Sequence, residues 1–454
     1  MPPRPLPFLF RLASLALVAA AALATPFARA TGPSEGPASP GVDVVKVQGV
    51  IDPALSAYVR GSIKQAQDRA ATVILQVDSR GAYGDEAVQL AKVIRSAGVP
   101  VVAWVGPSGA RAEGGALFLV YASSFVAIAP GAGIGPARPF DLAVRASRES
   151  ASAVRTNATE LTTVTGGAGV PRTAIRRLVD GAQMPAQTAL DSHAAALAAP
   201  DIPTLLHDLN GLRIVTPTGP VTLRTQAVGV SLRFHEIGFV QRLLHAVSTP
   251  TAVYVLLVLG LWGVAFEFTQ SGVGMAGIAG GVALALAIYG LTVIPFAVLG
   301  LAFVLGGTLL QALDVLIRRV GVVTIAGTAL FAVGSVQAWH GVSTEIDLAA
   351  WLIVFFSLGG LLFFGFGLTV ALKARERVRS AQVGLVGLLG EARSDLNPEG
   401  GVYVKGTLWR GRSMNGPIPK GRRVRVKGIE GLILRVQEET VATPPEEEDL
   451  PPLN

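Results

Sequence analysis

Residues Pro107 to Pro139 read PSGARAEGGALFLVYASSFVAIAPGAGIGPARP. The apolar stretch from Ala110 to Ser123 is typical of a helix, and the run FVAIAP that follows it is typical of a short buried strand. Earlier β-branched runs alternate with helical stretches in the same way, namely VVKVQGV, TVILQVD and VPVVAWVG. The connections are too long for hairpins, so this order predicts a layered α/β domain with a parallel sheet.

Glycine-containing segments follow three of the predicted strands. They are DSRGA from Asp78, GPSG from Gly106 and APGAGIG from Ala129. Ligands of open α/β sheets bind beyond the carboxyl ends of the strands, so a functional site of this domain is expected in these loops. For any one loop taken alone, ordinary turn chemistry is the better explanation of the same residues.

In order and spacing these segments resemble the ClpP-class, crotonase-like domain of the NfeD family of membrane serine endopeptidases. The resemblance rests on the stretch from Pro107 to Pro139 and on the earlier VDSRGA. It places the domain at residues 42–247. It implies a catalytic dyad in which a lysine takes the proton of a serine, since a serine hydroxyl is a poor nucleophile without a neighbouring base.

Both members of that dyad are replaced in this chain. The resemblance places Gly114 at the serine position and Val154 at the lysine position, with Arg155 beside it. Arginine does not release its proton at a useful pH, and the sequence has no lysine between Lys92 and Lys373. Where the family has consecutive glycines for its oxyanion-stabilising loop, this chain has Gly81 and Ala82.

Other catalytic arrangements stay open from the sequence. One alternative is a catalytic base recruited from Lys46, Lys64 or Lys92, although Lys92 is expected on a helix surface. Ser108 is the alternative nucleophile, although a turn before the helix also explains it. Residues of a possible serine-histidine-aspartate arrangement are Ser108, Ser123, Ser124, His193, His207, Asp191 and Asp208. Such triads are recognised by geometry rather than by sequence separation. Cysteine is absent, which excludes thiolate metal sites, and we expect neither a metal nor a cofactor.

The composition predicts several units, at least one of them in lipid. The chain has 454 residues, of which 50% are hydrophobic, and a formal net charge of +7. Arg4 and Arg11, an apolar run and the small residues around Ala30 predict a secretory signal peptide over residues 1–30. Residues 31–41 are rich in Pro, Gly and Ser and are expected to be a linker.

A membrane region is predicted over residues 250–373, with five apolar segments. They are Ala252–Phe268, Val273–Leu291, Phe296–Ile317, Val320–Val336 and Leu348–Leu372. Basic residues follow the third segment (Arg318, Arg319) and the fifth (Lys373, Arg375, Arg377, Arg379), whereas Glu345 and Asp347 lie in the fourth loop. The positive-inside rule therefore places the α/β domain outside the cytoplasm, in the periplasm or the extracellular space, and the C-terminus in the cytoplasm.

The membrane region contains an internal repeat with an offset of 47 residues. Glu267, Gly274, Ile278, Ala279 and Gly280 correspond to Asp314, Gly321, Ile325, Ala326 and Gly327. The glycines are expected to permit close helix packing. The repeated acid is expected to be an interfacial carboxylate, and an ion path is the alternative.

The C-terminal unit is predicted as a small all-β barrel over residues 381–437, followed by a disordered acidic tail over residues 438–454. It resembles the OB-like barrel of the NfeD family. Seven basic side chains could serve nucleic acid, anionic lipid or a partner protein, and they are Arg410, Arg412, Lys420, Arg422, Arg423, Arg425 and Lys427. With only Tyr403 and Trp409 available for stacking, we expect lipid or a partner rather than nucleic acid.

The sequence thus predicts a multidomain chain with a ClpP/crotonase-like α/β domain, a polytopic helical membrane region and an OB-like barrel. The resemblance implies a partner of the stomatin (SPFH) type and self-association into a homo-oligomer. The predicted function is a non-catalytic or weakened membrane scaffold. An active serine protease that uses another serine is the first alternative, and a transporter or channel is the second.

Overall fold

The computed structural model describes residues 41–144, 149–164, 169–216, 219–226, 230–267, 274–317, 321–340, 348–367 and 384–439. The predicted signal peptide, the linker up to residue 40 and all but the first residues of the acidic tail lie outside this part. So do the loop charges on which the membrane orientation was argued. The described residues form two compact units, with the division between Gly365 and Phe366.

The α/β domain is built on a parallel sheet of six strands in the order β11-β1-β2-β3-β5-β8. The strands are β1 (Gly41–Gln48), β2 (Thr72–Asp78), β3 (Val101–Val105), β5 (Phe125–Ile128), β8 (Leu197–Ala198) and β11 (Ser231–His235). All five residues of β3 are buried, as expected for a strand that is covered on both faces.

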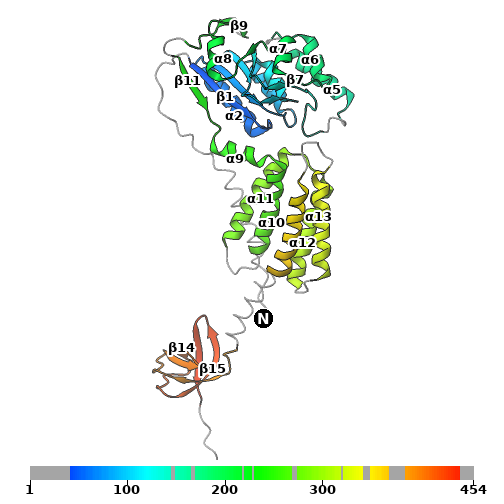
Figure 1. Cartoon of the computed structure of the whole chain (residues 1–454). Coiled ribbons are helices and arrows are strands. Elements are labelled where there is room, and N and C mark those ends of the chain that lie inside the picture. Colours follow the sequence, from blue (N-terminus) through cyan, green and yellow to red (C-terminus); the bar gives the residue numbers. More distant parts are fainter. Residues whose placement is uncertain are drawn as a thin grey trace, which may run out of the picture. The chain divides into compact units, whose positions relative to one another are not determined.

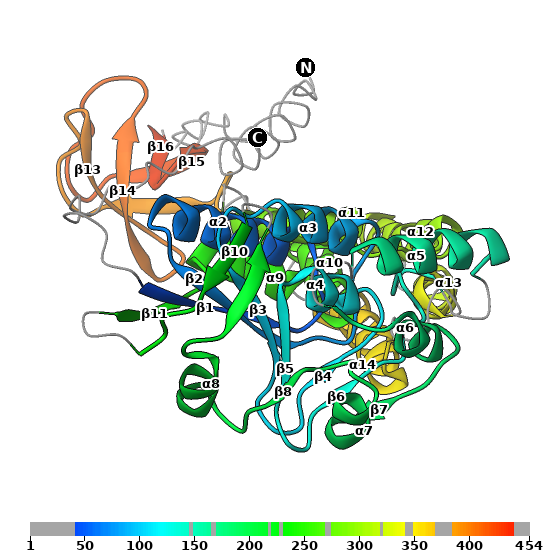
Figure 2. The same cartoon turned by 90° about the horizontal axis from the view of Figure 1, so that it is seen from above.

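Helices α2 (Pro53–Asp68), α3 (Glu86–Arg95) and α4 (Ala116–Ala122) pack side by side along this sheet (Figure 2). A second sheet of three short strands contains β4 (Arg111–Ala112), β6 (Gly133–Ile134) and β7 (Met184–Pro185). The remaining elements of the domain are α5 (Ala151–Val164), α6 (Arg172–Val179), α7 (Ala186–Asp191), α8 (Ile202–Leu209), β9 (Arg213–Thr216) and β10 (Gly219–Thr222). The predicted fold class is confirmed.

The prediction of one helix from Ala110 to Ser123 is partly wrong. Arg111 and Ala112 form strand β4, which pairs with β6, and helix α4 begins only at Ala116. The reason lies at Gly114, whose φ of +54° is incompatible with a continuing right-handed helix. The other end agrees with the prediction to within one residue, since α4 ends at Ala122 and Ser123 is its C-cap.

Helix α9 (Phe239–Val247) connects the α/β domain to five apolar helices (Figure 1). These are α10 (Pro250–Glu267), α11 (Met275–Val293), α12 (Val298–Ile317), α13 (Val322–Trp339) and α14 (Ala350–Leu362), the last of which continues as a π-helical turn (Phe363–Gly367). Among the described helices, α10, α11 and α13 are long and apolar enough to cross a membrane, whereas α12 up to Asp314 and α14 up to Phe366 are apolar but shorter.

The sequence repeat forms two similar helical hairpins, α10–α11 and α12–α13. In the first, a Cβ atom on Gly280 would lie 2.9 Å from the Gly260 carbonyl oxygen. In the second, a Cβ atom on Gly327 would lie 2.8 Å from the Gly307 carbonyl oxygen. Each hairpin is therefore so close at this point that only glycine fits, which is the small-residue packing typical of membrane helices.

The repeated acidic residues cap the second helix of each hairpin. Glu267 accepts hydrogen bonds from the amides of Gly274 and Gly277, at the start of α11. Asp314 accepts from the amides of Gly321 and Thr324, at the start of α13. The first amides of a helix lack partners within the helix, so a carboxylate satisfies them and complements the helix dipole. This contact explains the repeated acid without an ion path.

The C-terminal unit is a closed barrel in the strand order β12-β13-β14-β16-β15. The strands are β12 (Leu389–Ala392), β13 (Glu399–Val404), β14 (Thr407–Ser413), β15 (Arg423–Glu430) and β16 (Ile433–Glu438). Its core contains Val402, Val424, Val426 and Leu434, all fully buried. The predicted small barrel is confirmed.

Candidate functional site

The loops after strands β2, β3 and β5 come together at the carboxyl end of the sheet. The Ser79 amide donates to the Arg111 carbonyl at 2.7 Å, and the Glu113 amide donates to the Ser79 carbonyl at 3.0 Å. The Gly114 amide donates to the Pro136 carbonyl at 2.8 Å. The loops that the sequence singled out therefore meet at one edge of the sheet.

Gly114 lies where no side chain fits. Its φ is +54°, a conformation that side-chain-bearing residues rarely adopt. A Cβ atom would lie 2.5 Å from the Pro139 carbonyl oxygen and 3.4 Å from the Arg80 carbonyl oxygen. A serine at this position would require both an unusual backbone conformation and a shift of Pro139.

The loop with Gly81 and Ala82 is covered as well. Gly81 has a φ of +144°, and a Cβ atom on it would lie 2.9 Å from Cγ of Leu142. The Leu142 amide donates to the Ala82 carbonyl at 2.9 Å. On the other side, the Ala82 methyl group lies 3.0 Å from the position of a Cβ atom on Gly115. These residues leave little free space around the loop.

Residues 136–142, which we call the covering segment, are held in place by two acids. Glu149 accepts hydrogen bonds from Arg138 Nε at 3.0 Å and from the Phe140 amide at 2.9 Å, and its side chain is only 5% exposed. Asp141 accepts from the Gly84 amide at 2.8 Å. A buried, charge-assisted contact of this kind fixes the segment more firmly than an exposed ion pair does.

No catalytic base is present at the position that the resemblance indicates. Val154 lies on α5, half-buried against the domain core, and Arg155 is exposed. The remaining lysines of the domain, Lys46, Lys64 and Lys92, are all exposed on β1, α2 and α3. The predicted surface position of Lys92 is confirmed.

The residues of the possible triad are not brought together by hydrogen bonds. Ser108 is exposed beside Gly131, and Ser123 donates to the Leu119 carbonyl at 3.0 Å. His207 contacts Gln226, and His193 is exposed. In the described part of the α/β domain, no serine hydroxyl is hydrogen-bonded to a histidine or lysine nitrogen.

Sequence reasoning missed two histidine–aspartate contacts. His235 Nε2 on β11 lies 3.0 Å from Asp43 Oδ2 on β1, and His245 Nδ1 on α9 lies 3.0 Å from Asp52 Oδ2. The pair Asp52-Pro53 is a recognisable helix start, since Asp52 caps α2 through the Leu55 amide. Nothing in the sequence indicates the histidine partners, because they lie more than 190 positions away.

The contact between His245 and Asp52 shifts the pKa values of both side chains. The hydrogen bond to Asp52 raises the pKa of His245, although burial opposes this change. Burial alone would raise the pKa of Asp52, but the hydrogen bonds from His245 and from the Leu55 amide outweigh it and lower that pKa. The imidazolium–carboxylate form of this pair is therefore favoured in the folded state.

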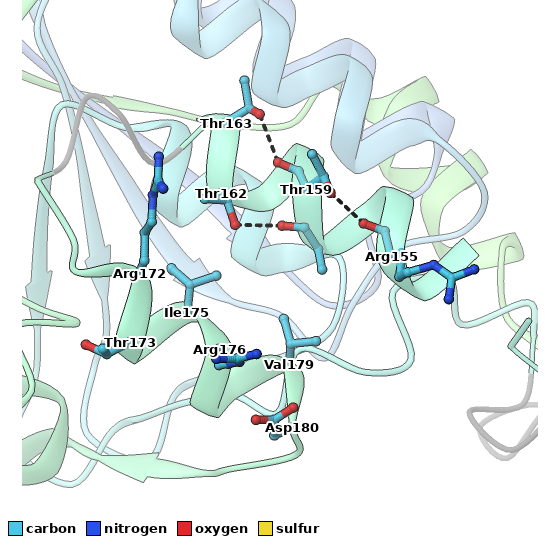
Figure 3. Close-up of a pocket in the computed structure, with 11 residues that line it drawn as sticks. Arg155, Thr159, Thr162, Thr163, Arg172, Thr173, Ile175, Arg176, Val179 and Asp180 are labelled. Atoms are coloured by element: carbon cyan, nitrogen blue, oxygen red, sulfur yellow. Dashed lines mark hydrogen bonds between the residues drawn. The ribbon is translucent and has the colours of Figure 1, made fainter. Parts of the chain in front are cut away.

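A groove of about 750 Å³ lies between α5 and α6 (Figure 3). Arg155, Arg172 and Arg176 line it together with Asp180. No ion pair to any of the three arginines is found among the described residues. The hydroxyls of Thr159, Thr162 and Thr163 donate to carbonyls of their own helix. The groove is thus suited to carboxylate groups, which guanidinium groups bind well.

Four of the seven basic side chains predicted on the barrel are paired with glutamates. Arg410 and Arg412 both pair with Glu399, Arg422 pairs with Glu438, and Arg425 pairs with Glu439. Of the seven basic side chains, Lys420, Arg423 and Lys427 have no such partner among the described residues. Trp409 packs partly against the barrel core, which leaves Tyr403 as the exposed aromatic residue of the two.

Two family models match the chain. Residues 251–370 match the NfeD integral membrane domain, and residues 383–438 match the NfeD-like C-terminal, partner-binding domain. The membrane-bound protease PH1510 of Pyrococcus horikoshii is 28% identical over 386 residues, which cover 82% of this chain and 87% of that protein.

Solved structures resemble the two ends of the chain. The 1510-N membrane protease specific for a stomatin homolog from Pyrococcus horikoshii is 22% identical, covers 46% of this chain and 98% of its own, and has a TM-score of 0.40. The C-terminal domain of the stomatin operon partner protein 1510-C from the same organism is 44% identical, covers 13% of this chain and 95% of its own, and has a TM-score of 0.13. The chain is therefore a multi-pass integral membrane protein that is similar to NfeD proteins in its membrane region and its C-terminal domain, and to the membrane-bound protease PH1510 over most of its length.

Proposed function

We propose that this chain is a non-catalytic, or catalytically weakened, NfeD-type membrane scaffold. The observation that carries the proposal is the contact at Gly114. The Pro139 carbonyl occupies the space in which a nucleophilic side chain would begin. Catalysis by a serine needs both the hydroxyl and a base, and the base alone contributes about 10²- to 10⁴-fold in rate.

Binding without hydrolysis fits the rest of the domain. The groove between α5 and α6 offers Arg155, Arg172 and Arg176 to acidic segments of a polypeptide client. Val154, at the position of the family's lysine, is the neighbour of one of these arginines on α5. A chain that retains such a groove but lacks the dyad can hold a client without cutting it.

The client that we propose is a stomatin-type (SPFH) membrane protein. Two findings support this choice: the similar solved structure is a protease specific for a stomatin homolog, and the C-terminal domain matches a partner-binding model. We further propose that the α/β domain, residues 42–247, lies outside the cytoplasm and forms a homo-oligomer, and that the barrel, residues 381–437, is cytoplasmic. For the barrel, the glutamate-paired arginines favour a protein partner over nucleic acid.

The test of this proposal is covalent capture of an activated serine. Full-length protein in lipid nanodiscs is treated with a fluorophosphonate probe, and we expect no labelled serine. The variant Gly114→Ser and the double variant Gly114→Ser/Val154→Lys are expected to stay unlabelled too, because the covering segment has no space for the new hydroxyl. Labelling of wild type at Ser108, together with peptide cleavage that Ser108→Ala abolishes, would establish the protease alternative.

A further inference from the structure

Helix α9 has an apolar face that the described protein does not cover. Phe239 is 80% exposed, Val240 is 43% exposed and Leu243 is 40% exposed. The helix has only nine residues, so it depends on contacts at its flanks rather than on its own propensity. Those contacts determine how α9 is oriented, and therefore which side of the helix faces the protein.

One face of α9 is turned towards the α/β domain. His245 contacts Asp52 at the start of α2, and a Cβ atom on Gly49 would lie 3.2 Å from His245 Nε2. The end of the helix is turned towards the membrane helices. Val247 is 4% exposed, and its carbonyl oxygen lies 3.2 Å from the position of a Cβ atom on Gly290, near the end of α11.

The exposed apolar residues lie on the same face as Val247. Leu243, Val240 and Phe239 precede Val247 by four, seven and eight residues, which is the spacing of one stripe along an α-helix. His245, by the same geometry, lies on the opposite side of the helix. The stripe therefore continues the surface that packs on α11, beyond the place where α11 ends.

We propose that this stripe, Phe239, Val240 and Leu243, is inserted into the surface of the lipid bilayer. The continuity with the membrane domain carries the argument, because α10 begins at Pro250, three residues after α9 ends. An amphipathic helix next to a span buries its apolar side at the boundary between headgroups and acyl chains. Arg242 lies exposed at the side of the stripe, 3.9 Å from Glu236 Oε2, and this loose, exposed pair leaves its guanidinium group within reach of anionic headgroups.

The chain has no cysteine, so single cysteines can report on each position without background. The full-length variants Phe239→Cys, Leu243→Cys and Lys64→Cys carry a nitroxide label in nanodiscs of phosphatidylcholine and phosphatidylglycerol. Lys64, exposed on α2, is the matched aqueous control. We expect a higher collision rate with oxygen, and a lower one with a water-soluble nickel chelate, at positions 239 and 243 than at position 64.

Two outcomes would overturn the proposal. Nickel collision rates at positions 239 and 243 that equal the rate at position 64 would place the stripe in water. Low collision rates with both reagents would show that protein covers it, such as a second copy of the chain. As a second measurement, Leu243→Glu should lower the melting temperature in nanodiscs more than in detergent micelles, and an equal loss in both would also contradict a lipid contact.

Discussion

His245 Nδ1 on α9 and Asp52 Oδ2 at the start of α2 lie 3.0 Å apart, so that an ion pair joins α9 to the α/β domain. Asp52 is almost fully buried, and the His245 side chain is 26% exposed. The Ile51 amide, next in the chain, donates to the Gly81 carbonyl at 2.9 Å. The pair therefore links the covered loop to the helix that leads into the membrane.

This ion pair predicts a pH dependence. The pKa of His245 is raised above its ordinary value of 6.5, so its stabilisation is complete below about pH 6.5 and is lost as the pH rises through the folded pKa. The pKa of Asp52 is lowered below 3.8, so its contribution is present above that value and is lost only in stronger acid. His245→Gln should therefore lower the free energy of unfolding by about 1–2 kcal/mol at pH 5.5 and by less at pH 8.5. Thermal unfolding in nanodiscs measures this, and the exposed His207→Gln is the control; an equal loss at both pH values would contradict it.

The contact at Gly114 predicts an unusually costly glycine substitution. Gly114 and Gly84 have nearly equal φ angles, +54° and +55°, but a Cβ atom on Gly84 would have no neighbour within 4 Å. Gly84→Ala should therefore lower the free energy of unfolding by about 1 kcal/mol, because of the backbone conformation alone. Gly114→Ala should cost more, because it also displaces the Pro139 carbonyl. Chemical denaturation of both variants isolates this difference, and equal costs would mean that the covering segment moves aside freely.

Capping of the membrane hairpins predicts a structural role for the repeated acids. Asp314→Ala should destabilise the α12–α13 hairpin by about 1–2 kcal/mol, since the amides of Gly321 and Thr324 lose their acceptor. Asp314→Asn keeps an acceptor oxygen, so this variant should lose less stability than Asp314→Ala. Melting temperatures in nanodiscs give the order of the variants. Ion flux through wild-type proteoliposomes that the alanine variant abolishes would instead revive the channel alternative.

The proposed orientation predicts opposite labelling of the two ends of the chain. In the cysteine-free background, Lys64→Cys reports on the α/β domain and Leu432→Cys on the barrel, where Leu432 is 76% exposed. On intact cells an impermeant maleimide should label position 64 only, and both positions after permeabilisation. Equal labelling of both before permeabilisation would exclude an odd number of membrane crossings.

The pairing of the barrel arginines predicts weak binding to lipid. With Arg410 and Arg412 on Glu399, only a few positive charges remain free, so binding of the isolated barrel to anionic vesicles should be slight and should vanish as salt is raised. Glu399→Gln removes the shared partner of both arginines, although Arg412 keeps Glu430 at 3.9 Å, and should therefore strengthen binding to the vesicles, which vesicle sedimentation detects. Salt-resistant binding to single-stranded nucleic acid would point to a different role.

The sequence by itself determined the alternation of strands and helices up to β5, the apolar helices, the duplicated hairpin and the C-terminal barrel. Each of these follows from a pattern within a short window, such as alternating β-branched runs or a constant offset between repeated glycines. Local patterns also misled at one place: the apolar run after Ala110 was expected to be helical throughout, whereas the backbone of Gly114 delays the helix to Ala116.

Only the tertiary structure decided what surrounds the candidate site. Gly114 is closed by a carbonyl 25 positions later, His245 reaches back across 193 positions to Asp52, and four barrel arginines pair with glutamates 11 to 16 positions away in the chain. The sequence named Gly114 through a resemblance, but no periodicity encodes which distant group fills the space beside it. Such contacts depend on how the sheet, the loops and the helices pack together, so they exist only once the chain has folded.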